Sequence, residues 1–249
     1  MKIYGRNTVE EALRSGATVD RLLVRRDARD AHANKILNMA RDRGVKTVLC
    51  DRAALDRECP KGANHQGFVA EVTDFVYSEP EDILAYAESR GEPPFIVILD
   101  GVEDPHNLGA VIRVAECAGI HGIVIPKHRA ASVNDTVIKV SSGAAEHMRV
   151  ARVTNINDTI AFLQERGVWV FAADMDGDDL YSANLTGAVA FVIGGEGKGV
   201  SRLTRERCDG VLAIPMFGKV NSLNASVAAG IVVYEKVRRD LAHPGGWAK

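Results

Sequence analysis

The sequence predicts an α/β protein, with a mostly parallel β-sheet in residues 95–249 and a small N-terminal α/β module in residues 1–75. Two observations carry this prediction. Runs of Val, Ile, Phe and Leu without polar alternation recur after Pro94, as in strands of a sheet that is covered on both faces. Segments with helical signals separate these runs, and repeated strand–helix units are typical of parallel sheets.

The N-terminal module alternates between helical and extended patterns. Asn7 or Thr8 can cap a helix that ends at Gly16, and a second helix is expected over residues 33–43. Short apolar runs bounded by turn residues predict the strands. The expected strands cover residues 21–24, 45–49 and 68–72.

Residues 76–94 interrupt the pattern and are expected to form a linker that holds one short helix, because the segment is acidic and bounded by prolines. Residues 1–75 carry 14 Lys/Arg against 11 Asp/Glu, a net charge of +3, whereas residues 76–94 carry 1 against 5, a net charge of −4. A basic module beside an acidic strip is compatible with RNA binding. Ordinary solvated charge explains the same counts.

Residues 95–249 are expected to fold as one domain of alternating strands and helices. Their apolar runs lack polar alternation, which favours buried parallel strands. The expected strands cover residues 95–99, 122–125, 148–153, 168–172, 189–193 and 211–214, and the expected helices cover residues 108–118, 156–166 and 225–240.

The sequence contains no sign of a membrane or secretory segment. No apolar run reaches roughly 18 residues, and the N-terminus lacks the apolar segment of a secretory signal. Four cysteines lie far apart with no CxxC pair, which favours reduced thiols in a cytoplasmic protein. The seven histidines show no ligand spacing, so we expect no metal.

A first polar segment, DGVEDPHNLGAVIR, spans residues 100–113 directly after an expected strand. Ligands of open α/β sheets bind beyond the carboxyl ends of strands. Pro105 and Asn107 lie at the expected start of the next helix, and Arg113 lies inside it. A helix cap followed by a surface arginine is an equally good interpretation of this segment alone.

A second segment, VIGGEGKG at residues 192–199, follows another apolar run. Its glycines allow backbone N–H groups to approach a ligand closely. A P-loop needs Ser or Thr after its lysine, but Gly199 follows Lys198, and a dinucleotide fingerprint needs GxGxxG rather than GxGxG. Both nucleotide motifs are therefore excluded. A simple tight turn leaves Glu196 unexplained.

A third segment, SLNASVAAG at residues 222–230, opens the expected C-terminal helix. Ser222 or Asn224 can cap that helix, whose N-terminus offers free N–H donors and favours anions. A well-capped core helix accounts for this segment when it is taken by itself.

Taken together, DPHNLGAVIR, IGGEGKG and SLNASVAAG resemble the three motifs of the SpoU (TrmH) superfamily of RNA 2′-O-methyltransferases, in the same order. IYGRNTVEEAL near the start and HQGFVAEV at residues 65–72 resemble the substrate-binding module of this family. The two-part layout is most similar to that of the bacterial members that methylate a guanosine in 23S rRNA.

The resemblance implies a fold, a reaction and partners. It implies a SPOUT-type sheet with a C-terminal trefoil knot and a homodimer formed through the knotted domain. It implies transfer of a methyl group from S-adenosylmethionine to a guanosine ribose 2′-hydroxyl of 23S rRNA. The same chemistry on tRNA or on another rRNA nucleotide remains an alternative. A non-catalytic RNA-binding or ribosome-assembly factor on this fold is another.

The resemblance also implies site residues. Gly194, Ile214 and Leu223 match cofactor-binding positions, and the positions that match the catalytic group are Asn107, Arg113, Glu196, Ser222 and Asn224. The role of Arg113 stays open between activating the hydroxyl and binding a phosphate. A guanidinium holds its proton up to a pKa above about 12, which disfavours the first role, and its fork suits the second.

Candidate RNA contacts in the N-terminal module are less specific. Arg25, Arg26, Arg29 and Lys35 are our candidates for phosphate contacts, and His65 is a weaker candidate for an RNA contact. A solvated charged face is the alternative.

Overall fold

The computed structural model describes residues 2–15, 17–73, 75–197, 199–220 and 222–242. The chain divides into two compact units, which are considered separately. The first unit comprises residues 1–76 with 132–135, and the second comprises residues 77–131 with 136–249.

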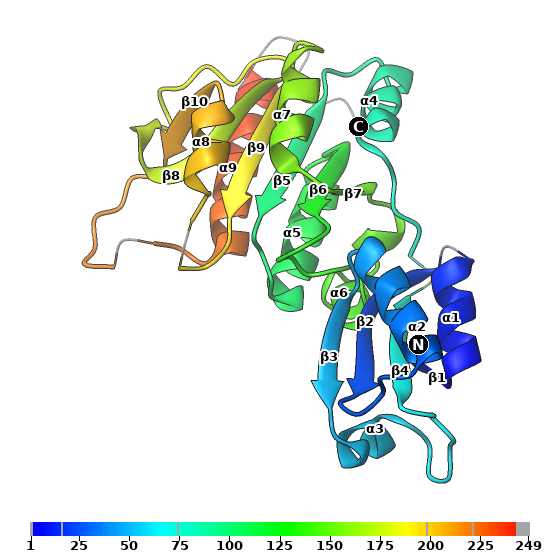
Figure 1. Ribbon diagram of the computed structural model, residues 1–249. Helices are drawn as coiled ribbons and strands as arrows, with labels where there is room; N and C mark the ends of the chain where they lie inside the picture. Colours follow the sequence, from blue (N-terminus) through cyan, green and yellow to red (C-terminus); the bar gives the residue numbers. More distant parts are fainter. Residues whose placement is uncertain (1, 16, 74, 198, 221, 243–249) are drawn as a thin grey trace. The chain divides into compact units, whose positions relative to one another are not determined.

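The first unit contains a mixed four-stranded sheet in its described residues, with the order β1-β4-β2-β3 (Figure 1). β2 and β3 pair in parallel, while β4 pairs antiparallel with both β1 and β2. The three strands expected from the sequence are confirmed. The additional strand, β1, has only three residues and no buried one, so it lacks an apolar signal. The strands are β1 (Lys2–Tyr4), β2 (Thr18–Arg25), β3 (Lys46–Cys50) and β4 (Phe68–Thr73).

Helices α1 (Arg6–Arg14) and α2 (Ala31–Asp42) bury apolar side chains against this sheet, and α3 (Arg52–Glu58) follows β3. The expected cap of α1 at Asn7 or Thr8 is wrong, because the helix already begins at Arg6 and Gly5 takes the cap position at φ 93°. A positive φ of this kind favours glycine.

The second unit is built on a six-stranded sheet, in which every strand pairing of the described residues is parallel. The order is β10-β8-β9-β5-β6-β7, so the chain adds strands on one side of β5 and then on the other. All six expected strands are confirmed. The strands are β5 (Phe95–Asp100), β6 (Gly122–Pro126), β7 (Val150–Val153), β8 (Trp169–Asp179), β9 (Val189–Gly194) and β10 (Gly210–Ala213).

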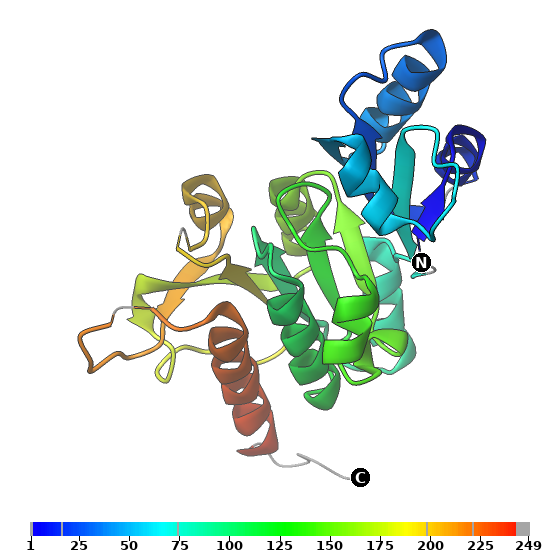
Figure 2. The same ribbon diagram turned by 90° about the horizontal axis from the view of Figure 1, so that it is seen from below.

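Helices cover both faces of this sheet, as its continuous apolar strands require (Figures 1 and 2). α5 and α9 pack against each other on one face, and α7 lies on the other with α8 beside it. Three short helices, α6, η1 and α8, are too brief to give a periodic signal. The helices are α4 (Pro80–Ser89), α5 (Pro105–Cys117), α6 (Asp135–Val140), η1 (Ala144–Glu146), α7 (Ile156–Gln164), α8 (Arg202–Arg207) and α9 (Ala225–Ala242).

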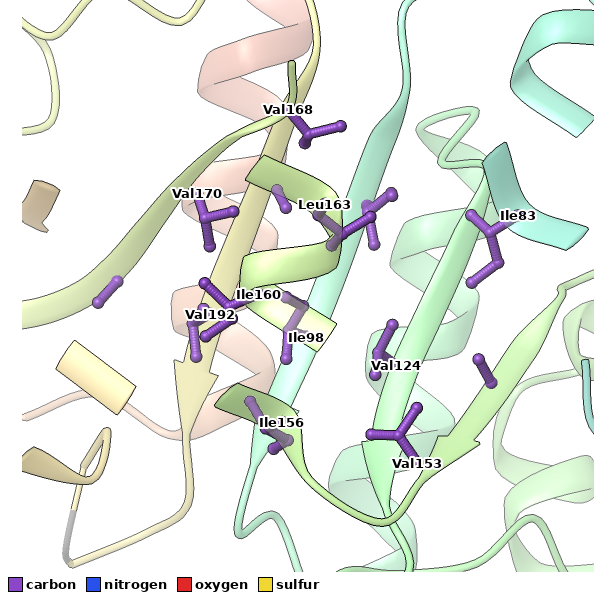
Figure 3. Packing of buried hydrophobic residues seen from close by; sticks show 14 of the residues in the cluster. Ile83, Ile98, Val124, Val153, Ile156, Ile160, Leu163, Val168, Val170 and Val192 are labelled. Carbon is purple, nitrogen blue, oxygen red and sulfur yellow. The ribbon is translucent and has the colours of Figure 1, made fainter. Parts of the chain in front are cut away.

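The core beneath α7 is fully apolar (Figure 3). Ile156, Ile160 and Leu163 of α7 lie over Ile98 and Val192 of the central strands, and all five side chains are buried. Each such side chain contributes about 1.5–3 kcal/mol on burial. This packing holds the central strands rigidly and so fixes where their carboxyl ends lie.

The segment expected as a linker takes part in the second unit. α4 is the expected short helix, but its Ile83 is buried in the same core as α7 (Figure 3). A side chain on Gly122, at the start of β6, would overlap Ile83, so the glycine makes room for the helix. The apolar positions of α4 therefore serve packing, which acidic composition and flanking prolines do not reveal.

Within the described residues, no helix is long and apolar enough to cross a membrane.

Candidate functional site

A cavity of about 620 Å³ opens at the carboxyl ends of β9 and β10, beside the middle of β8 and the start of α9. This is the edge at which ligands bind in open α/β sheets. Its volume lies within the range of about 300–1,000 Å³ that is usual for small-molecule sites. The lining residues are Ala173, Asp174, Met175, Ile193, Gly194, Gly195, Glu196, Gly197, Gly199, Leu212, Ile214, Met216, Ser222, Leu223, Asn224, Ala225 and Ala228.

The glycine-rich loop after β9 is folded tightly against neighbouring backbone. A side chain on Gly194 would overlap the backbone of Gly199 and Val200, and one on Gly195 would overlap the carbonyl of Gly101. The Gly195 N–H donates to the Asp100 carbonyl at 2.9 Å. The first and second motifs therefore share one backbone junction, which only glycine permits. Lys198 lies outside the described residues.

Three polar side chains from the three motifs meet at the cavity. Nδ2 of Asn107 donates to Oε1 of Glu196 at 3.0 Å, and Nδ2 of Asn224 donates to the same oxygen at 2.7 Å. Nδ2 of Asn224 also lies 2.9 Å from Oδ1 of Asn107. One carboxylate oxygen thus orients two amides, and their three sequence segments are held together.

The side-chain oxygen of Asn224 caps the N-terminus of α9. Its Oδ1 accepts hydrogen bonds from the Ser226 N–H at 2.9 Å and from the Ser226 hydroxyl at 2.6 Å. The sequence offers Ser222 or Asn224 as the cap of α9. The structure shows the capping hydrogen bond at Asn224, while Ser222 lies in the cavity wall. The cap and the polar cluster are therefore one feature.

Arg113 lies on α5, outside the cavity wall. Its side chain is exposed, and its guanidinium has no hydrogen bond or ion pair with any residue that the structure describes. The helical rise places it about 9 Å along the axis from Asn107. α5 packs on α9 close to this point, since Val114 is the nearest neighbour of Gly230. Three of the five expected catalytic residues are in mutual contact, and Arg113 stands apart as a free cation.

All three expected cofactor residues, Gly194, Ile214 and Leu223, line the cavity. The sequence prediction missed Asp174 and Met216, which also line it. Asp174 belongs to the extension of β8 beyond residue 172, and its carboxylate lies 3.9 Å from the guanidinium of Arg205. Polar residues that follow an apolar strand were the signal that could have found Asp174.

Two of the candidate phosphate contacts in the first unit are engaged in ion pairs. Lys35 lies 2.8 Å from Glu10, and Arg25 pairs with Asp27. Arg26 and Arg29 are exposed and form no ion pair within the described residues. In the same part of the chain, no group of three or more His, Cys, Asp and Glu side chains could hold a metal ion.

Comparison with known families gives two matches that together span the two units. The family model described as SpoU rRNA Methylase family matches residues 94–234. A second model, described as RNA 2'-O ribose methyltransferase substrate binding, matches residues 2–78.

Relatives and solved structures cover nearly the whole chain. The 23S rRNA (guanosine-2'-O-)-methyltransferase RlmB of Escherichia coli (strain K12) is 41% identical, over 95% of this chain and 98% of its own length. An uncharacterized tRNA/rRNA methyltransferase of Mycobacterium sp. (strain KMS) is 42% identical, over 95% and 76%. The SpoU methyltransferase AviRb from Streptomyces viridochromogenes, solved in complex with AdoMet, superposes with a TM-score of 0.62 at 25% identity, over 98% and 91%.

Proposed function

This chain belongs to the SpoU rRNA methylase family, and from that premise we propose that it transfers a methyl group from S-adenosylmethionine to the ribose 2′-hydroxyl of a guanosine in 23S rRNA. The two family matches and the 41% identity to a 23S rRNA methyltransferase support this reaction. We propose that the reaction takes place in the cytoplasm, because the proposed substrate is ribosomal RNA.

A single observation carries the proposal: one cavity is bounded by the second and third motifs, and the first motif reaches it through Asn107. Along the sequence, Glu196 lies 89 residues after Asn107, and Asn224 lies 117 residues after Asn107. Helix capping alone explains each segment separately but does not require their side chains to share one carboxylate oxygen. A common ligand site, by contrast, requires these three segments to come together.

The residues of the cavity fit S-adenosylmethionine. Backbone at Gly194 and apolar side chains at Ile214 and Leu223 can hold an adenosine group, and we propose them as cofactor contacts. Asp174 and Glu196 line the same space and suit a ligand that carries positive charge. When bound, the cofactor supplies an electrophilic methyl group on a sulfonium.

The protein's own contribution is alignment and charge. A ribose hydroxyl is a weak nucleophile, so it must be held in line with the methyl group and lose its proton during attack. We propose that Asn107, Glu196, Ser222 and Asn224 shape the place where the ribose sits. The fixed hydrogen bonds among Asn107, Glu196 and Asn224 reduce the reorganisation needed during the reaction.

We assign Arg113 to a phosphate beside the target ribose. It is exposed and no carboxylate in the described residues pairs with it, so its guanidinium is available for bidentate binding. A guanidinium also holds its proton too strongly to serve readily as a base. Phosphate binding by Arg113 therefore explains its exposed, unpaired guanidinium better than general-base activation does.

We further propose that the second unit forms the SPOUT trefoil knot and a homodimer. Its glycine loop packs directly on the backbone of Gly101, as a tightly crossed chain requires. On α9, Val227, Tyr234 and Leu241 are 50%, 47% and 44% exposed at seven-residue spacing, which places them on one stripe. A second copy is the occupant that fits this apolar stripe.

Mapping 2′-O-methyl positions in 23S rRNA tests the proposal. Ribosomal RNA from cells that contain the protein should carry a 2′-O-methyl group at one guanosine, and RNA from cells without the protein should lack it. Unmodified transcript should gain a methyl group at the same guanosine when it is incubated with the protein and S-adenosylmethionine. Methylation of tRNA alone would replace the substrate with the alternative one. RNA binding without transfer from the labelled cofactor would favour a non-catalytic factor.

A further inference from the structure

Two hollows on the first unit adjoin each other at Arg25 and Gln66, with volumes of about 590 and 510 Å³. We propose that they form one site for an unpaired nucleotide of the RNA substrate and its flanking phosphates. The inference rests on the proposed function and names the part of the first unit that recognises RNA. The lining residues are Arg6, Asn7, Arg25, His32, Arg52, Asp56, Pro60, Lys61, Gly62, Ala63, Asn64, His65, Gln66 and Gly67.

Gln66 is held in a conformation that its own side chain does not favour. Its φ is 49°, in the left-handed region, which few non-glycine residues adopt and which often marks functional sites. Arg6 fixes it twice, because the Arg6 N–H donates to Oε1 at 3.1 Å and the Arg6 Nε donates to the Gln66 carbonyl at 3.2 Å. Gln66 is exposed, and its side-chain amide N–H₂ has no partner among the described residues, so two donors are free.

The buried side chain of His65 holds the loop that carries Gln66. His65 is 5% exposed; its Nδ1 accepts from the Gly67 N–H at 2.9 Å, and its Nε2 lies 3.1 Å from Asp56 Oδ1. These partners assign the proton to Nε2. His65 therefore positions the loop and is buried beneath it, which makes an RNA contact by its ring a poor interpretation.

The charge at the rim suits phosphate. Arg25, Arg52 and Lys61 line the larger hollow, and the single carboxylate in its wall, Asp56, is already bound by His65. Arg52 reaches Asp56 only at 3.8 Å, and Lys61 has no ion pair within the described residues. These three cations, of which Arg25 also pairs with Asp27, surround the side-chain amide of Gln66 and match RNA that presents an unpaired base between phosphates.

The site also selects among the cations expected from the sequence. Arg25 remains a phosphate contact, and its backbone N–H binds the Gly67 carbonyl at 2.9 Å, which ties it to the loop. Arg26, Arg29 and Lys35 do not line either hollow. We therefore replace them with Arg52 and Lys61.

The test measures affinity of the full-length protein for unmodified 23S rRNA transcript, by filter binding over a range of salt concentrations. Gln66→Gly keeps the positive φ and removes the amide, and Lys61→Gln removes one exposed cation. Arg41→Gln is the matched control, because Arg41 is 77% exposed on α2 and lines neither hollow. Thermal melting and S-adenosylmethionine binding verify that each variant is folded.

We expect Gln66→Gly to weaken RNA binding roughly tenfold and to raise KM for RNA while kcat at saturation is unchanged. Lys61→Gln should lower the slope of log K against log salt by about 0.7, the value for one phosphate contact with a single strand. Wild-type affinity and slope in both folded variants would overturn the site. Wild-type protein that binds the transcript without methylating it would instead overturn the proposed reaction and leave this site standing.

Discussion

At the scale of single residues, the site depends on one oxygen of Glu196. That oxygen accepts from Asn107 and Asn224, so it orients both amides and joins segments that are distant in the chain. Each residue type could be predicted from its motif, because each also makes local sense as a cap or turn residue. Their contact could not, since a tertiary hydrogen bond between such segments leaves no periodic signal.

Glu196→Ala should leave the fold intact and reduce methyl transfer by roughly 100-fold, because displaced amides misplace the reacting ribose. Single-turnover transfer of labelled methyl to 23S rRNA measures the effect. Glu206→Ala is the control, since Glu206 is exposed on α8 and pairs with Arg202 on the same helix. Equal rates for Glu196→Ala and the control would remove Glu196 from the site.

Gly195→Ala should disrupt the loop, because the added methyl group would overlap the carbonyl of Gly101. We expect a loss of about 1–3 kcal/mol in the free energy of unfolding, together with weaker S-adenosylmethionine binding. Denaturant titration and calorimetry measure the two quantities. In Gly218→Ala the added methyl group would meet only the Val220 nitrogen, at 4.0 Å, and Gly218 has no positive φ, so this variant should match the wild type in both. Unchanged cofactor affinity in Gly195→Ala would contradict the loop's role.

At the scale of elements, α9 departs from a simple amphipathic helix. Glu235 and Lys236 are charged yet only 6% and 3% exposed. Glu235 accepts from Arg238 and Arg239, and Lys236 binds Asp240 at 2.6 Å. The sequence predicts the helix from its cap and apolar positions, but it cannot show that two charged positions are buried through pairing along the helix.

The Glu235 carboxylate should contribute to acid stability. Hydrogen bonds from Arg238 and then Arg239 lower its pKa from 4.5 to about 2. Because the folded pKa lies below the unfolded one, the stabilisation is present above pH about 4.5 and is lost as the pH falls toward 2. Glu235→Gln should therefore melt below the wild type at pH 7, with a gap that closes between pH 4.5 and 2.

Glu165→Gln is the matched control for this measurement, because Glu165 is 76% exposed and lies 3.9 Å from Arg166. Its melting temperature should follow the wild type at every pH. A Glu235→Gln gap that stays constant down to pH 2 would mean that the carboxylate charge does not cause the stabilisation.

The exposed stripe of α9 should form the interface between two copies. Tyr234→Glu places a charge in the centre of the stripe and should convert a dimer into a monomer at micromolar concentration, as measured by sedimentation equilibrium. Leu203→Glu alters a similarly exposed apolar side chain on α8 and should remain dimeric. A monomeric wild type, or a dimeric Tyr234→Glu, would refute the interface.

The element boundaries show where sequence patterns suffice. Long apolar strands such as β5 and β9 fall within one residue of their expected ranges, because burial on both faces leaves an uninterrupted signal. β8 runs seven residues past its expected end into acidic sequence, where exposed residues alternate less regularly. The sequence pattern predicts that Ile83 belongs to a linker, but Ile83 packs on Gly122. Only tertiary contact distinguishes a helix in a linker from a helix that packs on the core.

At the scale of the whole molecule, the two units divide the work that we propose. The second holds the cofactor cavity and the polar cluster, and the first carries the basic hollows. Motif resemblance could predict the reaction and six of the 17 residues that line the cavity. The trefoil knot and the dimer that we propose would leave no trace in periodicity, because both depend on how distant segments pass or meet.

The central claim is that one cavity binds S-adenosylmethionine and that Arg113, an exposed arginine outside the cavity wall, engages RNA. The most direct test measures both functions of Arg113→Ala: equilibrium binding of S-adenosylmethionine and transfer of its labelled methyl to unmodified 23S rRNA. The account predicts unchanged melting and cofactor affinity, with transfer reduced by at least roughly 100-fold. Transfer at the wild-type rate by the folded variant would contradict it.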